Sequence, residues 1–95
     1  MASGVVLPVA KNEFNPKYPD TAKKAGKEGK VLLEVTIDEK GIPHDIVAVT
    51  NLGFGLEEAA IEALKKTTFR PATKAGKPIS LRVIQPVKFT LKDSD

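Results

Sequence analysis

The only histidine of the chain, His44, is the residue that most directly suggests metal chemistry. It stands beside Asp45 and shortly after Asp38 and Glu39. Imidazole and carboxylate groups are zinc ligands, so this cluster is conceivable as a weak metal site. A lone histidine in a predicted loop of a chain without cysteine is poor support for such a site. We therefore expect neither a functional metal nor a cofactor.

Nucleophilic and acid–base catalysis also have little support in the sequence. The chain contains no cysteine, which excludes thiolate chemistry and disulfides. Ser3 and Ser94 fall in the terminal segments, and Ser80 has no base at a characteristic spacing. No carboxylate pair lies in an apolar setting that would shift its pKa toward neutrality. We predict that the chain is not an enzyme.

A glycine motif at residues 26–29, Gly-Lys-Glu-Gly, matches the Gly-x-x-Gly loop of RNA-binding KH domains. A KH loop joins two helices, whereas Gly29 leads directly into residues 31–37, whose apolar residues alternate as in a strand. Lysines cluster at 23–30 and 65–77 in a chain of formal charge +3. Such clusters are usually solvated surface. A KH-like RNA-binding module is thus the weaker alternative, and we expect no nucleic-acid partner.

Residues 80–91 carry the clearest structural pattern of the chain. Apolar residues at odd positions alternate with mostly polar ones, broken only by Gln85, which predicts a half-buried strand. Pro86 restricts where this strand lies, because proline lacks an N–H and occurs at sheet edges and bulges. An edge strand exposes backbone groups that can pair with a strand of another chain. Alternatively, Pro86 blunts the edge against such pairing.

The other elements must position that strand. A short helix is predicted at 19–25, with Gly26 fitting a left-handed C-terminal cap. Strands are predicted at 30–38 and 45–51 around a turn at 38–41. The second of these strands has apolar residues at both even and odd positions, so its facing stays open. A second helix is predicted at 56–67 from its apolar stripe.

These segments predict one α+β domain in the order α-β-β-α-β. With 95 residues, 41% of them hydrophobic and 28% charged, the chain suits one small globular domain. The second helix is a crossover, and the simplest solution puts the last strand beside the first. We expect a three-stranded antiparallel or mixed sheet in the order second–first–last, with two helices on one face. Residues 1–14 are expected to form a flexible N-terminal arm, 15–92 the domain and 93–95 a tail.

The sheet face without helices is expected to expose a few aliphatic side chains. Leu32, Ile84 and one of Val47 or Val49 fall on it. An exposed apolar patch can mark an interface, including one between two copies of the chain, so a homodimer is one reading. Scattered aliphatic side chains are also ordinary on a small domain.

Several short segments of the chain follow, in order and in spacing, the pattern of a known family. They span about residues 15–91, and each alone is a weak signal. The segments are Tyr18-Pro19, Lys24-Ala25-Gly26, Glu28-Gly29-Lys30-Val31, Asp38-Glu39-Lys40-Gly41, Glu58-Ala59-Ala60, Ala63-Leu64, Phe69-Arg70-Pro71-Ala72, Gly76-Lys77-Pro78 and Pro86-Val87-Lys88-Phe89. Together they resemble the C-terminal domain family of the energy transducer TonB.

The resemblance implies the periplasmic domain of an inner-membrane-anchored protein, excised here from a membrane helix and a Pro-rich spacer. Such domains engage the TonB box, a short segment of outer-membrane receptors that adds as a strand to the edge of the last strand. Force from the proton gradient, supplied through an ExbB/ExbD-type motor, then lets iron chelates or cobalamin enter. The alternative is a TonB-like interaction or scaffold domain of another envelope protein.

The expected partner-binding residues lie in two segments. We expect the last strand to supply the pairing edge, with its proline limiting the register, and the segment before the first helix to touch the partner. The aromatic residue of that segment, Tyr18, is also expected to anchor the helix end. The residues are Asn15, Pro16, Tyr18, Arg82, Val83, Ile84, Gln85 and Pro86.

Two positions depart from the family pattern. Thr67 stands where many members have tryptophan, two residues before the aromatic Phe69. Asn15 stands where some members carry a glutamine that helps to contact the receptor. Asparagine keeps the amide group but shortens its reach. These differences bear on which receptor is bound more than on the fold.

Overall fold

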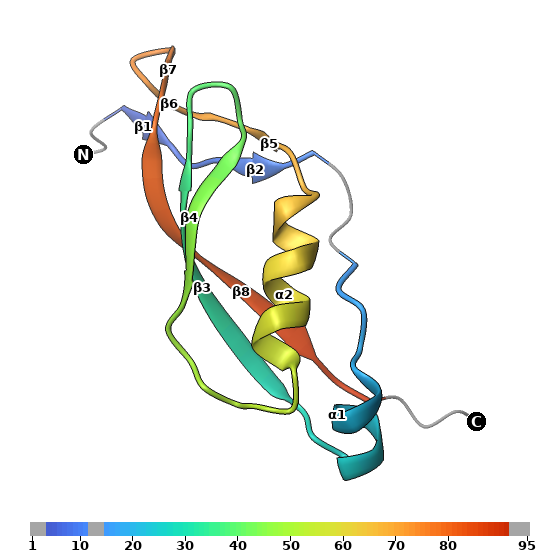
Figure 1. Ribbon diagram of the computed structural model, residues 1–95. Coiled ribbons are helices and arrows are strands. Elements are labelled where there is room, and N and C mark those ends of the chain that lie inside the picture. Colours follow the sequence, from blue (N-terminus) through green and yellow to red (C-terminus); the bar gives the residue numbers. More distant parts are fainter. Residues whose placement is uncertain (1–3, 12–14, 92–95) are drawn as a thin grey trace.

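The computed structural model describes residues 4–11 and 15–91, and Figure 1 shows its elements. The helices are α1 (Asp20–Ala25) and α2 (Leu56–Lys65). The three long strands are β3 (Gly29–Ile37), β4 (Pro43–Ala48) and β8 (Leu81–Phe89). The short strands are β1 (Val5–Val6), β2 (Val9–Ala10), β5 (Phe69–Arg70), β6 (Ala72–Lys74) and β7 (Lys77–Ile79).

The main sheet consists of the three long strands in the order β4-β3-β8. Both neighbouring pairs are antiparallel, and β8 pairs with β3 from Gly29↔Phe89 to Ile37↔Leu81. The predicted order second–first–last is therefore confirmed, and the choice between an antiparallel and a mixed sheet is settled as antiparallel. The last strand lies at an edge of this sheet, as its proline predicts.

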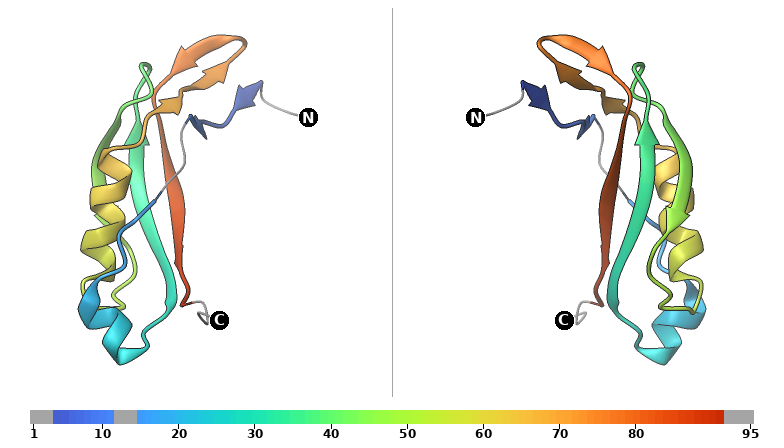
Figure 2. Two further views of the ribbon diagram at one scale, coloured as in Figure 1. Left: turned by 90° about the vertical axis from the view of Figure 1, so that its right-hand side faces the viewer. Right: turned by 90° about the vertical axis from the view of Figure 1, so that its left-hand side faces the viewer.

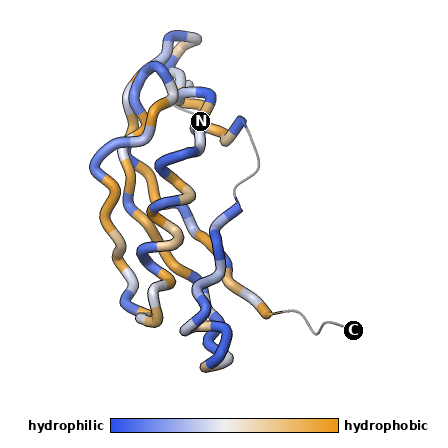
Figure 3. Tube along the Cα trace, turned by 45° about the vertical axis from the view of Figure 1, so that its right-hand side comes forward, coloured by the Kyte–Doolittle hydropathy of each residue, from blue (hydrophilic) through white to orange (hydrophobic). Residues whose placement is uncertain are grey.

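The hydrophobic core lies between the main sheet and the two helices. Figure 2 shows α1 and α2 on the same side of β3 and β8. The odd-numbered residues of β3 supply the centre of the core because alternate side chains of a strand point to one face. The hydrophobic stretches follow the strands, whereas the chain around α1 is mostly hydrophilic (Figure 3). The buried cluster comprises Ala22, Val31, Leu33, Val35, Ile37, Leu56, Ala60, Leu64, Phe69, Val87 and Phe89.

Strand β4 begins and ends earlier than the 45–51 that its sequence predicts. Its register against β3 shifts between Glu34 and Thr36. Asp45 lies at this bulge with φ 53°, a left-handed conformation that most residues avoid. The even-numbered Ile46 and Ala48 pack against the core. The facing that the sequence leaves open is thereby resolved, with the odd-numbered valines on the outer face.

Helix α2 is positioned by a carboxylate that binds the loop before it. Glu57 accepts hydrogen bonds from the N–H groups of Leu52 (2.6 Å) and Gly53 (3.0 Å) and from the Thr50 hydroxyl (3.2 Å). Burial alone would raise the pKa of Glu57, but these hydrogen bonds together outweigh it and hold the pKa below its usual value. The helix ends at Lys65, two residues before the predicted Thr67.

Two small antiparallel sheets that the sequence does not predict lie beside the main sheet. β1 and β7 flank β6, and β2 pairs with β5. Two-residue strands are too short to show a period, so residues 5–10 are expected only as part of a flexible arm. They are instead paired with the segment after α2, and the Lys11 N–H also donates to the Thr68 carbonyl (2.9 Å).

The arm and tail predicted at 1–14 and 93–95 fall partly or wholly outside the described residues, which exclude 1–3, 12–14 and 92–95. The division of the chain into arm, domain and tail stays a prediction. Within the part of the chain that the structure describes, neither helix has the length or the apolar character needed to cross a bilayer.

Candidate functional site

The outer edge of β8 presents its backbone groups to solvent, and the hydrogen bonds of Leu32 in β3 fix which ones. The Leu32 N–H donates to the Thr50 hydroxyl (3.2 Å), and its C=O accepts from the Val49 N–H (2.9 Å), both on the β4 side. Leu32 is the register partner of Pro86. Because the Leu32 groups point away from β8, this is a non-hydrogen-bonded pair, and the Pro86 groups point away from β3.

Alternation along an antiparallel strand extends this result to the rest of β8. The even-numbered residues Arg82, Ile84, Pro86 and Lys88 direct their backbone groups to the open edge. The odd-numbered residues form the ladder with β3. Among the described residues, β3 is the only strand paired with β8. The open edge therefore offers four carbonyl acceptors but only three N–H donors, since proline has none.

The side chains of this strand divide between the two faces of the sheet. Val83 and Gln85 are half-buried on the helix side, and Val83 packs against the core. On the outer face, 54% of Ile84 is exposed. The Arg82 guanidinium donates to the Thr36 hydroxyl (2.9 Å) and lies 3.4 Å from a carboxylate oxygen of Glu34. Because their backbone groups pair with β3, Val83 and Gln85 can contact a visiting strand only through their side chains.

The segment before α1 is anchored at the far end of β8 by Tyr18. Its ring meets the ring of Phe89 edge-to-face, with the centroids 5.3 Å apart, and its hydroxyl donates to the Lys27 carbonyl. Desolvation, followed by the nearby Glu28 carboxylate, raises the pKa of Tyr18. The expectation that Tyr18 anchors the helix end agrees with these contacts.

Asn15 and Pro16 lie further along this extended segment, where Asn15 is exposed and Pro16 half-buried. Asn15 lines a hollow of about 440 Å³ with Lys17, Pro19 and one flank of α2. The floor on the α2 side contains Ala59 and Ala63. The structure brings together the five predicted residues of β8 along one strand, whereas Asn15 lies beside α2.

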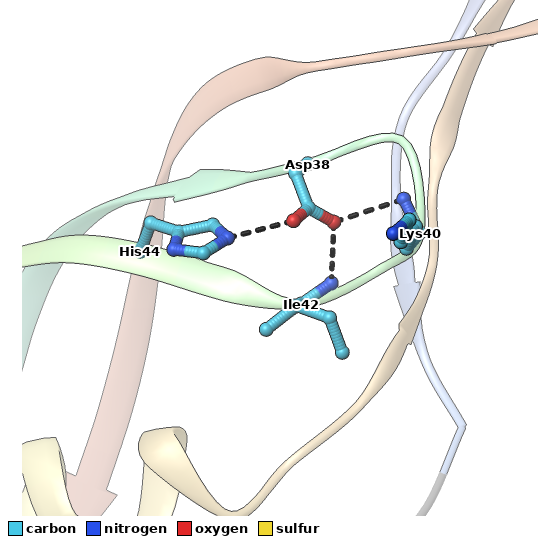
Figure 4. A network of polar contacts seen from close by, with 4 residues as sticks. All are labelled: Asp38, Lys40, Ile42 and His44. Atoms are coloured by element: carbon cyan, nitrogen blue, oxygen red, sulfur yellow. Dashed lines mark hydrogen bonds and ion pairs between the residues drawn. The ribbon is translucent and has the colours of Figure 1, made fainter.

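The side chains around His44 form the hydrogen bonds of a turn. One oxygen of Asp38 accepts the N–H groups of Lys40 and Ile42, both at 2.9 Å, and the other pairs with His44 Nε2 at 2.6 Å (Figure 4). The Ile42 N–H, with help from His44, lowers the pKa of Asp38. Within the described residues, no group of three metal-ligating side chains occurs.

The glycine motif that suggests an RNA-binding loop has a different structural role. Gly26 is the C-terminal cap of α1 with φ 66°, and Gly29 is the first residue of β3. The loop thus joins a helix to a strand, unlike the loop of a KH domain. Its Glu28 accepts a hydrogen bond from the Leu91 N–H (2.7 Å), which ties the loop to the end of β8.

The sequence predicts the edge but not the contact that one of its side chains makes. Gln85 Nε2 donates to the Pro86 carbonyl (3.1 Å), which is one of the four acceptors of the open edge. The only signal for this in the sequence is a polar residue on an otherwise apolar face, directly before a proline. That signal marks Gln85 as unusual without indicating which group it binds.

Comparisons with known proteins agree with this architecture. The profile of the Gram-negative bacterial TonB protein C-terminal family matches residues 14–91. The TonB protein of Vibrio cholerae is 32% identical over 81 residues, which are 84% of this chain and 33% of that protein. The TonB protein of Xanthomonas campestris strain B100 is 36% identical over 83 residues, 86% of this chain and 37% of that protein.

A solved structure supports the fold independently. The solution NMR structure of the Pseudomonas aeruginosa TonB CTD matches with a TM-score of 0.73 and 22% sequence identity, covering 99% of this chain and 93% of that one. This chain spans about a third of the length of these two TonB proteins. It belongs to the Gram-negative TonB C-terminal family, whose members are energy transducers in transport and iron uptake and not enzymes.

Proposed function

We propose that this chain is the periplasmic domain of a TonB-type energy transducer, which binds the TonB box of outer-membrane receptors by β-strand addition. The receptor segment pairs with the outer edge of β8, and the coupling drives active uptake of iron chelates or cobalamin. The observation that carries the proposal is the open edge of β8, where Arg82 and Ile84 direct both their N–H and C=O groups away from β3.

Backbone pairing suits a domain that must engage receptors of different sequence. Each backbone hydrogen bond contributes about 0.5–1.5 kcal/mol net and does not depend on the side chain. The open edge can form a short ladder with a visiting strand. Arg82 and Ile84 each offer an N–H and a C=O, Pro86 offers a C=O, and the strength comes from several bonds acting together. Contacts of side chains beside the edge then set the preference among receptors.

The remaining partners belong to the whole transducer. An ExbB/ExbD-type motor in the inner membrane would act through a region upstream of this domain, and the domain itself would work in the periplasm. Asn15, Pro16 and Tyr18 complete the proposed contact surface, with Tyr18 holding the segment at the end of β8 through Phe89. The aliphatic residues of the outer sheet face make a homodimer a further proposal, which size-exclusion chromatography with light scattering tests.

The proposal is tested by titrating a TonB-box peptide into the isotopically labelled domain and following its backbone amides. We expect shifts at residues 80–88 and around Asn15, with slowed hydrogen exchange at the N–H groups of Arg82 and Ile84. A peptide of the same length with alternate residues replaced by proline is the control, because it cannot form the ladder. Shifts centred on residues 23–30, or a response to RNA in place of the peptide, would reject the proposal.

The alternative is a TonB-like interaction or scaffold domain of another envelope protein. Such a domain would use the same edge for a partner that is not a receptor. Failure of every receptor peptide together with pairing of a different envelope segment at Arg82 and Ile84 would favour it.

A further inference from the structure

The helix side of β8 carries one polar residue in the row that a visiting strand would meet. Val83 and Val87 are apolar, and Val87 is buried, whereas Gln85 between them is a half-buried amide. Its Nε2 donates to the carbonyl of the next residue, Pro86, at 3.1 Å. This carbonyl is directed to the open edge, as the hydrogen bonds of its register partner Leu32 require.

The amide of Gln85 thus shares an acceptor that a visiting strand would use. The Pro86 carbonyl oxygen has two lone pairs, so it can accept from Gln85 and from a visiting N–H at the same time. The Gln85 amide also carries a second N–H and an oxygen, and a docked strand would shield both from water. If they find no partner in the interface, the cost exceeds what a net hydrogen bond contributes.

A side chain of the visiting strand can supply the missing partner. Residues opposite the odd-numbered positions of β8 point to the same face as those positions, whichever direction the visiting strand runs. The residue opposite Gln85 therefore lies against its amide. A hydroxyl or amide there gives the Gln85 amide a hydrogen-bond partner, whereas an aliphatic side chain leaves its remaining groups unpaired.

We propose that Gln85 is a specificity-determining residue of the docking edge, which selects peptide segments bearing a hydrogen-bonding side chain at the position opposite it. The inference rests on the proposed function, because it assumes strand addition at β8. It adds a chemical requirement on the partner. Segments that are apolar at this position pair less well with this domain.

The test uses matched peptides that differ by one hydroxyl group. In an eight-residue host peptide of alternating β-branched residues, each position in turn is made Thr or Val, which are nearly equal in shape. We measure Kd for each pair by amide titration of the domain. At one position, the Thr peptide should bind about fivefold more tightly than the Val peptide, as one net hydrogen bond predicts.

The Gln85→Val variant should abolish or invert the preference at that position while still binding the peptides. Ile84→Val is the matched control, because its side chain lies on the outer face and should leave the preference unchanged. Thermal unfolding of both variants checks that they fold. An unchanged preference in Gln85→Val, with shifts still at Arg82 and Ile84, refutes the role of Gln85 but leaves strand addition intact. Absence of shifts at the edge with every peptide refutes both.

Discussion

A proline scan along β8 tests whether its even-numbered residues direct their backbone groups to the open edge, on which strand addition depends. Ile84→Pro removes an N–H that points to the open edge and takes no part in the ladder with β3. Pro86, two residues further on, is also an even-numbered residue of β8, so the strand tolerates proline at such positions. The variant should therefore fold with a loss of less than about 1 kcal/mol in the free energy of unfolding.

Binding should respond much more strongly than folding. The visiting strand loses the donor at Ile84, and its own carbonyl opposite that position stays unpaired. An unpaired polar group in an interface costs about 1–3 kcal/mol, so Kd for the receptor peptide should rise at least about fivefold. Kd is measured by isothermal titration calorimetry, and the free energy of unfolding by urea titration followed by circular dichroism.

Val83→Pro is the matched control, one residue away at an odd-numbered position that pairs with β3. Its N–H belongs to the ladder with β3, so proline there should cost about 3 kcal/mol or more of stability. If Ile84→Pro destabilises the fold as much as Val83→Pro does, the assignment of even residues to the open edge is wrong. If Ile84→Pro leaves Kd unchanged, the peptide binds elsewhere.

Three further predictions concern the scaffold. Gly41 has φ 85°, and a Cβ there would lie 1.9 Å from the Phe69 carbonyl oxygen. Gly41→Ala should therefore lower the free energy of unfolding, measured by urea titration, by about 2–4 kcal/mol. Its control Gly76→Ala, at φ 81° with open space around it, should lose only about 1 kcal/mol. Glu57→Ala should cost about 1–3 kcal/mol in thermal unfolding, because the amides before α2 lose their acceptor. Folding lowers the pKa of Asp38 and Glu57 below their ordinary values of 3.8 and 4.5; their stabilisation is complete above those values and lost as pH falls through the folded pKa, so a Tm that stays constant from pH 5 to pH 2 contradicts it.

The long elements are predictable from sequence because their side chains repeat at the period of the element. The alternation in residues 31–37 and 81–89 fixes which face of β3 and β8 is buried, and Pro86 fixes the edge position. β4 is harder, because the bulge at Asp45 shifts its register and the apolar residues on its two faces are equally numerous. The bounds of such a strand follow from pairing with β3 rather than from its own sequence.

The small sheets and the details of the site depend on contacts between segments that are distant in sequence. β1 and β2 exist because residues 69–74 offer backbone groups to pair with, which no local pattern reveals. The direction of the backbone groups of β8 likewise follows from the side of β3 that Leu32 uses toward Val49 and Thr50. Sequence identifies the edge strand. Only the three-dimensional pairing shows that its even-numbered residues carry the outward backbone groups.

Pro86 combines the two roles that the sequence leaves as alternatives, protection of the edge and its use in binding. Because its nitrogen faces outward, it costs the edge one donor without disturbing the ladder with β3. A long edge-to-edge pairing is interrupted at this point, while Arg82 and Ile84 keep complete pairs of groups. A short visiting segment needs only those two residues and the carbonyl beside Gln85. The same proline therefore discourages extended pairing and leaves a docking site of limited length, which a single receptor segment can occupy.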